Sequence, residues 1–219
     1  CVLLEPNAIA GLANRALSVF ARRVCTGFEE TARFFSDKKV VYTGNPVRRT
    51  LQPRLHEGSD PSLFTLLVFG GSAGASRINR VTPSAVAKLN DALGSHPATN
   101  RPKIKVIHQT GERDYEEVKT DYESRGISAR VVPFTNSMGQ AYAEADLVIC
   151  RAGAITLAEV ALLKKAAILV PYPYASDNHQ QANAEMMVRA GAAIMVLDKC
   201  LTVERLAHVL NDVLLERNI

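Results

Sequence analysis

A glycine followed by a helical pattern and a carboxylate is the stretch of this chain best suited to chemistry. In residues 150–159 an apolar run ends, Gly153 makes a turn, and a helical pattern leads to Glu159. Backbone N–H groups at a helix start lack intrahelical partners and lie at the positive end of the helix dipole. A diphosphate can therefore bind at Gly153, Ala154 and Ile155 without a cationic side chain. Glu159, about one turn further in, can accept hydrogen bonds from ribose hydroxyls. The stretch predicts a phosphate and sugar site, with an ordinary buried strand-to-helix turn as the alternative.

A second glycine-rich turn, residues 70–76, stands between an apolar strand pattern and a helical pattern. Glycines at such a turn let the backbone approach a ligand closely. The segment lacks the Lys-Ser/Thr pair of a P-loop, and its spacing differs from the Gly-x-Gly-x-x-Gly dinucleotide pattern. Ser72 could hydrogen-bond a phosphate oxygen, although capping the helix is the commoner role for such a serine.

Side-chain amides are dense in residues 171–184, which close a strand pattern and open a helical one. An amide both donates and accepts hydrogen bonds, as a sugar hydroxyl does, so Gln180 with His179 beside it suits a hexose ring. Capping of a surface helix by Asp177 or Asn178 is the alternative. All three segments follow strand patterns, and parallel sheets bind ligands at the carboxyl ends of their strands. Together the segments predict a site for a nucleotide-sugar such as a UDP-hexose.

The elements that must position these segments form an α/β pattern from Phe64 onward. Short apolar strands alternate with helices, which predicts a Rossmann-like parallel sheet flanked by helices. Strands are expected at residues 64–69, 105–109, 130–134, 147–150, 167–171 and 193–197. Helices are expected after Ser76 and from Thr202, which is placed as an N-cap. Before residue 50 only a strand end, a helix over 11–20 and a strand over 40–42 are expected.

Composition narrows the class of protein. The chain has 219 residues, of which 47% are hydrophobic, so it is long enough for a full core, and no apolar run reaches the ~20 residues that span a bilayer. Four scattered cysteines without a Cys-x-x-Cys pair predict free thiols and a reducing compartment. The net charge of +4 is too mild to indicate nucleic acid. Residues 1–54 carry nine basic and four acidic side chains, which suits either a solvated surface or contact with lipid headgroups or diphosphate.

Five motifs, in order along the chain, resemble those of the MurG family of bacterial transferases, which move N-acetylglucosamine from UDP onto lipid I. They are residues 5–14, 44–48 (Gly-Asn-Pro-Val-Arg), 70–75, 151–159 and 177–184. The resemblance runs nearly end to end and implies a GT-B fold, in which two Rossmann-like domains hold the donor in their cleft. It implies that residues 1–49 are a remnant of the N-terminal acceptor domain and hinge. Residues 50–219 would then be the C-terminal nucleotide-sugar-binding domain.

The resemblance also implies roles for individual residues. Asn7 and Arg48 would reach the donor from the hinge side, and Ser72 would lie near the diphosphate. Gln180 would hold sugar hydroxyls, and Thr135 stands where the family contacts the uracil. The phosphate and ribose turn would consist of Ala154, Ile155, Thr156, Leu157, Ala158 and Glu159. No Asp-x-Asp motif occurs, so no metal or other cofactor is expected, and the helix dipole and side-chain donors would balance the charge of departing UDP.

The sequence departs from the family pattern at several positions. Leu4 and Pro6 replace the usual His and Gln beside Glu5, and Thr135 replaces an aliphatic residue. Ala73 and Ala152 replace Gln and Ser. The family's N-terminal glycine-rich segment, with the histidine expected to be the general base, has no counterpart. No catalytic residue is therefore assigned.

The chain accordingly resembles the donor-binding half of an inverting hexosyltransferase acting on lipid I in peptidoglycan synthesis. The alternative is a non-catalytic donor-binding fragment, or a subunit of a split UDP-sugar transferase with another lipid acceptor. The resemblance implies UDP-N-acetylglucosamine, a lipid-linked acceptor, an anionic membrane surface and a separate acceptor domain as partners. It implies a cytoplasmic protein at the inner face of the plasma membrane, with a plastid form as an alternative.

Overall fold

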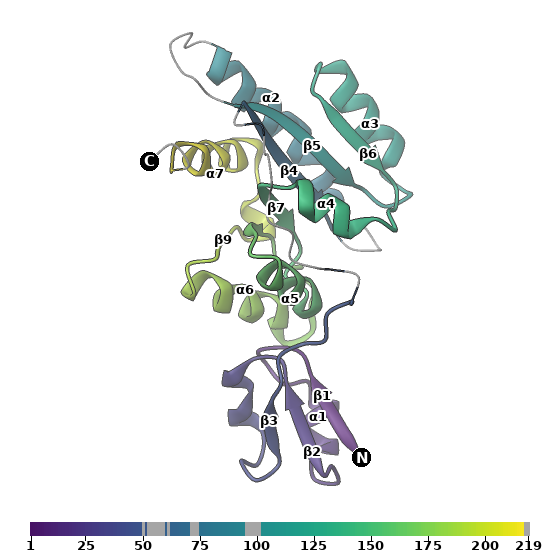
Figure 1. Cartoon of the computed structure of the whole chain (residues 1–219), viewed down its shortest axis with the longest axis vertical. Helices are drawn as coiled ribbons and strands as arrows, with labels where there is room; N and C mark the ends of the chain where they lie inside the picture. Colours follow the sequence, from purple (N-terminus) through teal and green to yellow (C-terminus); the bar gives the residue numbers. More distant parts are fainter. Residues whose placement is uncertain (50, 52–59, 61, 71–74, 95–101, 217–219) are drawn as a thin grey trace.

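Two parallel sheets organise the chain and lie one beyond the other along its long axis (Figure 1). The computed structural model describes residues 1–49, 51, 60, 62–70, 75–94 and 102–216. One sheet has three strands in the order β1-β2-β3, and the other has six in the order β6-β5-β4-β7-β8-β9. The connection between Tyr42 and Leu63 joins them, and the domain boundary predicted at residues 49 and 50 falls within it.

The three-stranded sheet and its helices, residues 2–42, are called the N-terminal unit below. Its elements are β1 (Val2–Glu5), α1 (Leu12–Leu17), β2 (Arg23–Thr26), η1 (Glu29–Phe34) and β3 (Val40–Tyr42). The strand β2 was missed in the sequence, although its short Arg-Val-Cys-Thr run lies between the two expected strands. The helix α1 is shorter than predicted, because the chain turns at once: the N–H of Phe20 donates to the carbonyl of Leu17 at 3.1 Å.

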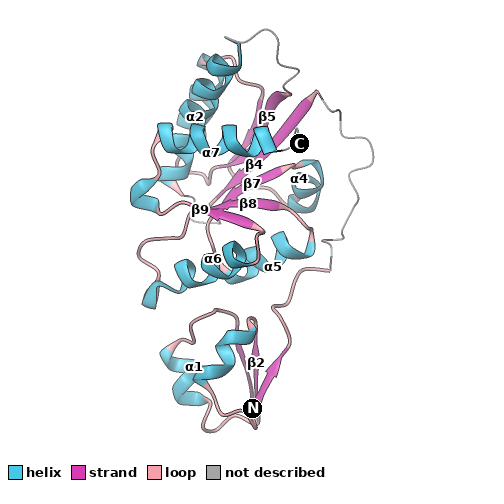
Figure 2. Cartoon of the chain, turned by 90° about the vertical axis from the view of Figure 1, so that its left-hand side faces the viewer, coloured by secondary structure: helices cyan, strands magenta, loops and turns pink. Residues whose placement is uncertain are grey.

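The six-stranded sheet with its helices is called the sheet unit below. Its strands are β4 (Leu63–Phe69), β5 (Lys103–Gln109), β6 (Ala129–Val132), β7 (Leu147–Cys150), β8 (Ala166–Leu169) and β9 (Ala193–Met195). Its helices are α2 (Ser76–Gly94), α3 (Tyr115–Ser124), α4 (Met138–Glu144), α5 (Ala154–Leu162), α6 (His179–Arg189) and α7 (Val203–Glu216). Figure 2 shows these helices around the strands, with α2 and α7 next to each other.

Both faces of the larger sheet are covered. Along β4, Leu66 and Val68 belong to a buried cluster that includes residues of α2, α3 and α7. Leu67 and Phe69 point the other way, into a cluster that includes residues of α4, α5 and α6. A parallel strand buried on both faces carries a continuous apolar run, which is why β4 was recognisable in the sequence.

The α/β fold with a parallel sheet is confirmed, and within the sheet unit the ends of the strands differ from the prediction. The strand β6 ends at Val132 and β8 at Leu169, two residues short of the expected ends in each case. Pro133 and Pro171 lie just beyond these ends, and proline has no N–H to donate to a sheet. The N-cap at Thr202 is confirmed, because its hydroxyl accepts a hydrogen bond from the N–H of Arg205 at 3.2 Å.

Candidate functional site

The order of the strands marks the place where a ligand is expected. From β4 the chain moves outward through β5 to β6, and it then returns to β7 on the other side of β4. The order of the strands therefore reverses between β4 and β7, which makes this place a topological switch point. Open α/β sheets bind ligands at such a switch point. The glycine-rich turn at residues 70–76 follows β4, and the Gly153 turn follows β7.

The helix α5 begins with unpartnered backbone donors, as the sequence predicts. Gly153 is the N-cap in an extended conformation, and its carbonyl accepts the first helical hydrogen bond from Leu157 at 3.0 Å. The N–H groups of Ala154, Ile155 and Thr156 donate to no other described residue. Three free donors at the positive end of a nine-residue helix suit a diphosphate.

The carboxylate of Glu159 lies in α5 with only 6% of the residue exposed. One oxygen, Oε1, accepts from the guanidinium of Arg48 at 3.1 Å and 3.0 Å. The other, Oε2, accepts from the hydroxyl of Tyr142 at 3.3 Å. A carboxylate has about four acceptor positions, so these partners orient Glu159 and leave acceptor capacity for ligand hydroxyls. Arg48, whose side chain is 57% exposed, provides a cation beside this carboxylate.

Two neutral groups surround this carboxylate. Burial raises the pKa of Tyr142 far above its usual value, and the nearby charge of the Glu159 carboxylate raises it further. Tyr142 therefore stays protonated and donates its hydrogen bond to Glu159. Burial, with a smaller effect from Glu159, raises the pKa of the Cys150 thiol to about 12. Cys150 is consequently an unreactive core residue.

Asn183 joins the N-terminal unit to the turn before α5. Its side chain is fully buried, and its Oδ1 accepts from the N–H of Ala8 at 2.8 Å. Its amide donates to Oδ1 of Asn7 at 3.0 Å and to the carbonyl of Ala152 at 3.2 Å. Asn7, predicted to contact the donor, also donates from its own amide to Glu5 at 3.3 Å. The structure thus uses the side chain of Asn7 to join the two units.

The side-chain amide of Asn45 also connects the N-terminal unit to α5. Asn45 donates to the carbonyl of Pro6 at 2.9 Å and to that of Ala154, in the first turn of α5, at 3.4 Å. A Cβ at Gly27 would collide with the side chain of Asn45, so a larger residue there would displace Asn45. Asn45 and Arg48 belong to one short motif, and both hold the connection against α5.

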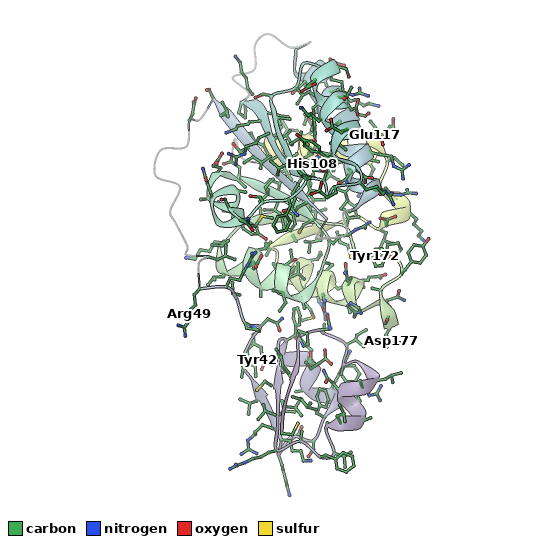
Figure 3. The ribbon with its side chains drawn as sticks, turned by 90° about the vertical axis from the view of Figure 1, so that its right-hand side faces the viewer. Tyr42, Arg49, His108, Glu117, Tyr172 and Asp177 are labelled. Atoms are coloured by element: carbon green, nitrogen blue, oxygen red, sulfur yellow. The ribbon has the colours of Figure 1, made fainter. Side chains whose placement is uncertain are left out.

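The amide-rich segment follows β8 and leads into α6. Gln180 accepts a hydrogen bond through Oε1 from the N–H of Tyr172 at 2.9 Å, and His179 donates through Nδ1 to the carbonyl of Ser176 at 2.7 Å. The alternative of capping is wrong for Asn178, which is the N-cap of α6 but makes no side-chain hydrogen bond to it. Figure 3 shows Tyr172 and Asp177 along one flank of the sheet unit. The roles predicted for His179 and Gln180 remain predictions.

Thr135 lies apart from the start of α5, beside a cavity of about 230 Å³ between α4 and the sheet face. Its hydroxyl accepts from the N–H of Ser137 at 3.0 Å. The lining is apolar at Leu67, Ile107 and Met138, with polar groups such as Gln109 and Thr135. Such a lining suits a flat polar ring, but no contact links Thr135 to Glu159 directly.

Two sequence predictions fall outside the described residues: Ser72, expected near the diphosphate, and the replacement at Ala73. Among the residues that the structure describes, no three His, Cys, Asp or Glu side chains gather closely enough to hold a metal ion. Within the same residues, no helix is long and apolar enough to cross a membrane.

Sequence reasoning did not single out Tyr142, Asn45 or Asn183. Asn45 and Asn183 lie inside motifs that the sequence analysis quoted, so their motifs were a signal. Tyr142 carried none, because a tyrosine at an apolar helical position usually belongs to the core.

The strand order and the helix start of α5 define a Rossmann-like domain with a candidate ligand site at the carboxyl edge of the sheet. Residues 65–218 match the glycosyltransferase family 28 C-terminal domain. The chain belongs to glycosyltransferase family 28, whose members are glycosyltransferases.

Curated relatives agree with this assignment. A protein of Syntrophus aciditrophicus named UDP-N-acetylglucosamine--N-acetylmuramyl-(pentapeptide) pyrophosphoryl-undecaprenol N-acetylglucosamine transferase is 44% identical, over 96% of this chain and 56% of its own length. The Geobacter metallireducens protein of the same name is 41% identical, over 96% and 57%. The chain therefore spans about half the length of the curated relatives that it matches.

A solved structure gives the same result for the fold. The crystal structure of Acinetobacter baumannii MurG is 34% identical and superposes with a TM-score of 0.77, covering 97% of this chain and 58% of that chain. A putative UDP-N-acetylglucosamine 2-epimerase from Listeria monocytogenes has a TM-score of 0.65 at 9% identity, which shows the fold alone. The likeness to MurG confirms the predicted GT-B class.

Proposed function

We propose that this chain supplies the donor site of an inverting hexosyltransferase that moves N-acetylglucosamine from UDP-N-acetylglucosamine to lipid I in peptidoglycan synthesis. The observation that carries the proposal is the geometry of α5, where the buried carboxylate of Glu159 lies one turn inside three free backbone N–H groups. These groups match the ribose and diphosphate of a nucleotide. The names of the relatives at 41% and 44% identity point to the same donor.

In this proposal the site works by stabilising the departing UDP. The bond between the sugar and the diphosphate breaks, and negative charge grows on the diphosphate. The N–H groups of Ala154, Ile155 and Thr156 and the guanidinium of Arg48 would oppose that charge in place of a metal ion. Glu159 would hold the ribose, and Gln180 with His179 would bind the sugar hydroxyls. The general base would come from outside these residues.

Calorimetric titration with UDP-N-acetylglucosamine tests the proposal, with UDP-glucose and GDP-mannose as controls. Saturable binding that is selective for UDP, and unchanged by a metal chelator, is the expected result. Binding of GDP-mannose with equal affinity would contradict the predicted selection of uracil. Binding lost on chelation would contradict the proposal that no metal takes part.

The substitution Glu159→Ala tests the residue that carries the proposal. Loss of a buried polar partner should weaken UDP binding by about 1–3 kcal/mol. Glu117→Ala is the matched control, because Glu117 is an exposed carboxylate on a different helix, α3 (Figure 3). Equal UDP affinity in the two variants would show that Glu159 does not bind the ribose. Transfer of N-acetylglucosamine by the chain itself would exclude the alternative of a non-catalytic subunit.

The N-terminal unit would contact an anionic membrane surface. Its helix α1 has no buried residue, and Leu17, Val19 and Phe20 are 52%, 69% and 83% exposed. Lys39 donates to the carbonyl of Val19 at 2.6 Å, and Arg22 and Arg23 follow in the chain. Exposed apolar side chains with neighbouring cations suit anionic lipid. Phe20→Ser should reduce sedimentation with anionic vesicles, and unchanged sedimentation would contradict the contact.

A further inference from the structure

A carboxylate outside the predicted site connects the segments that form it. Asp198 is the first residue of the short helix η3 (Asp198–Cys200), which follows β9. Its Oδ1 accepts from the guanidinium of Arg151 at 2.6 Å, and its Oδ2 accepts from Nε of Arg77 at 3.2 Å. The side chain of Asp198 is 14% exposed, so solvent screens these ion pairs only in part.

Arg151 extends this connection to the end of β8. The side chain is 12% exposed and stands directly before the turn that leads to α5. The nitrogen that binds Asp198 also donates to the carbonyls of Val170 and Pro171, each at 3.2 Å. The guanidinium lies over the ring of Tyr172 at 5.6 Å, and the N–H of Tyr172 donates to Gln180. One arginine thus links the phosphate turn to the amide-rich segment.

Arg77 brings in the third segment. It is the second residue of α2, the helix that follows the glycine-rich turn after β4. Residues that follow β4 and β7 therefore meet at the side chain of Asp198, and the end of β8 is connected to it through Arg151. A nearly buried guanidinium such as that of Arg151 needs a counter-ion, because the burial of an unpaired charge is costly.

We propose that Asp198 is a positioning residue that fixes the phosphate turn and the amide-rich segment relative to each other without touching the donor. This inference rests on the proposed function where it concerns the donor. Without Asp198, the guanidinium of Arg151 would turn toward water and release the carbonyls of Val170 and Pro171. The segment that carries Gln180 would then no longer keep a fixed position relative to the start of α5.

The test compares Asp198→Ala with Glu144→Ala in the full chain. Glu144 is the matched control, because it also bridges two cations, Lys105 at 3.1 Å and Arg130 at 3.0 Å, but at the β5–β6 edge of the sheet. Hydrogen exchange is measured on both proteins without ligand, followed by calorimetry with UDP. Asp198→Asn keeps the side-chain size and provides a second variant if the alanine variant does not fold.

We expect exchange in residues 170–176 to rise about tenfold in the Asp198 variants, while β4 and β7 keep their protection. The Glu144 variant should change only near β5, β6 and α4. UDP affinity should fall about tenfold in the Asp198 variants and stay unchanged in Glu117→Ala, the exposed control on α3.

Unchanged exchange in residues 170–176 would overturn the positioning role, whether or not UDP binds. Faster exchange in those residues with undiminished UDP affinity would overturn the link to the donor. Faster exchange in a chain whose unmodified form binds no UDP would leave Asp198 as a positioning residue and overturn the proposed function instead.

Discussion

The sheet unit and the N-terminal unit differ in how completely their strands are buried. Strands β4 and β7 are buried on both faces by helices. In the N-terminal unit, the sheet residues Val2, Leu4 and Val41 are 62%, 40% and 41% exposed. The sheet unit therefore has a core of its own, whereas the N-terminal unit leaves part of its sheet open.

Several of the contacts between the two units are polar, although Phe28 also packs against the core of the sheet unit. Asn183, Asn45 and Arg48 bridge them through hydrogen bonds and an ion pair, and all three bridges end at α5 or at the turn before it. Polar contacts depend on geometry more steeply than apolar packing does. A change in the relative position of the two units should therefore also move the start of α5.

Asn183→Ala should have the largest effect on the connection. The substitution leaves the N–H of Ala8 and the carbonyl of Ala152 without their partner in a buried place, which costs about 3 kcal/mol. Urea unfolding should show the loss, and hydrogen exchange should be fastest in the N-terminal unit. Asn136→Ala, at an exposed position, is the control. Equal stability of the two variants would mean that Asn183 does not hold the units together.

Protonation of histidine at low pH should change the stability of the sheet unit alone, because residues 1–49 contain no histidine. In the sheet unit His108 is fully buried between Tyr122 at 3.0 Å and Asn79 at 3.1 Å. Burial lowers the pKa of His108 from 6.5 to about 3, against a smaller opposing effect of Asp114. Above pH 6.5 neither state is protonated. Between pH 6.5 and 3 only the unfolded state binds the proton. The free energy of unfolding therefore decreases as the pH is lowered.

The expected loss from His108 is about 1.4 kcal/mol per pH unit in that window, or about 2 kcal/mol between pH 7 and pH 5. Unfolding by urea at several pH values measures it. The His108→Gln variant should lose this part of the slope, whereas His208→Gln, at an exposed position, should keep it. An identical slope in the His108 variant would contradict the assignment.

Tyr142→Phe should have the smallest effect. It removes one hydrogen bond of 3.3 Å to Glu159 but keeps the ring that packs edge-on against Phe69. A loss of about 1 kcal/mol in UDP binding is expected, with little change in thermal stability. A larger loss in stability than in binding would mean that Tyr142 supports the core rather than the orientation of Glu159.

Most of the sheet unit was predictable from the sequence. Fully buried strands carry unbroken apolar runs, and amphipathic helices such as α7 repeat every three to four residues, so local pattern identifies both. The strand β2 and the early end of α1 were missed. Both lie in the N-terminal unit, where incomplete burial weakens the pattern on which the prediction depends.

The candidate site was predictable in part. The helix start after Gly153 and the position of Glu159 follow from local spacing, and both are as expected. The partners of Glu159 do not follow from it, because Arg48 is separated from Glu159 by 111 positions along the chain. Asp198 had no local signal at all.

The sequence by itself determined the alternation of strands and helices in the sheet unit, the helix start after Gly153 and the family, because these depend on neighbouring residues and short motifs. The tertiary structure alone decided which carboxylate meets which arginine and which amide joins the two units. Asn183 and Asn7 lie 176 positions apart. Such pairs form only after packing has brought distant segments within about 3 Å of each other, and hydrogen bonds tolerate little deviation from that distance.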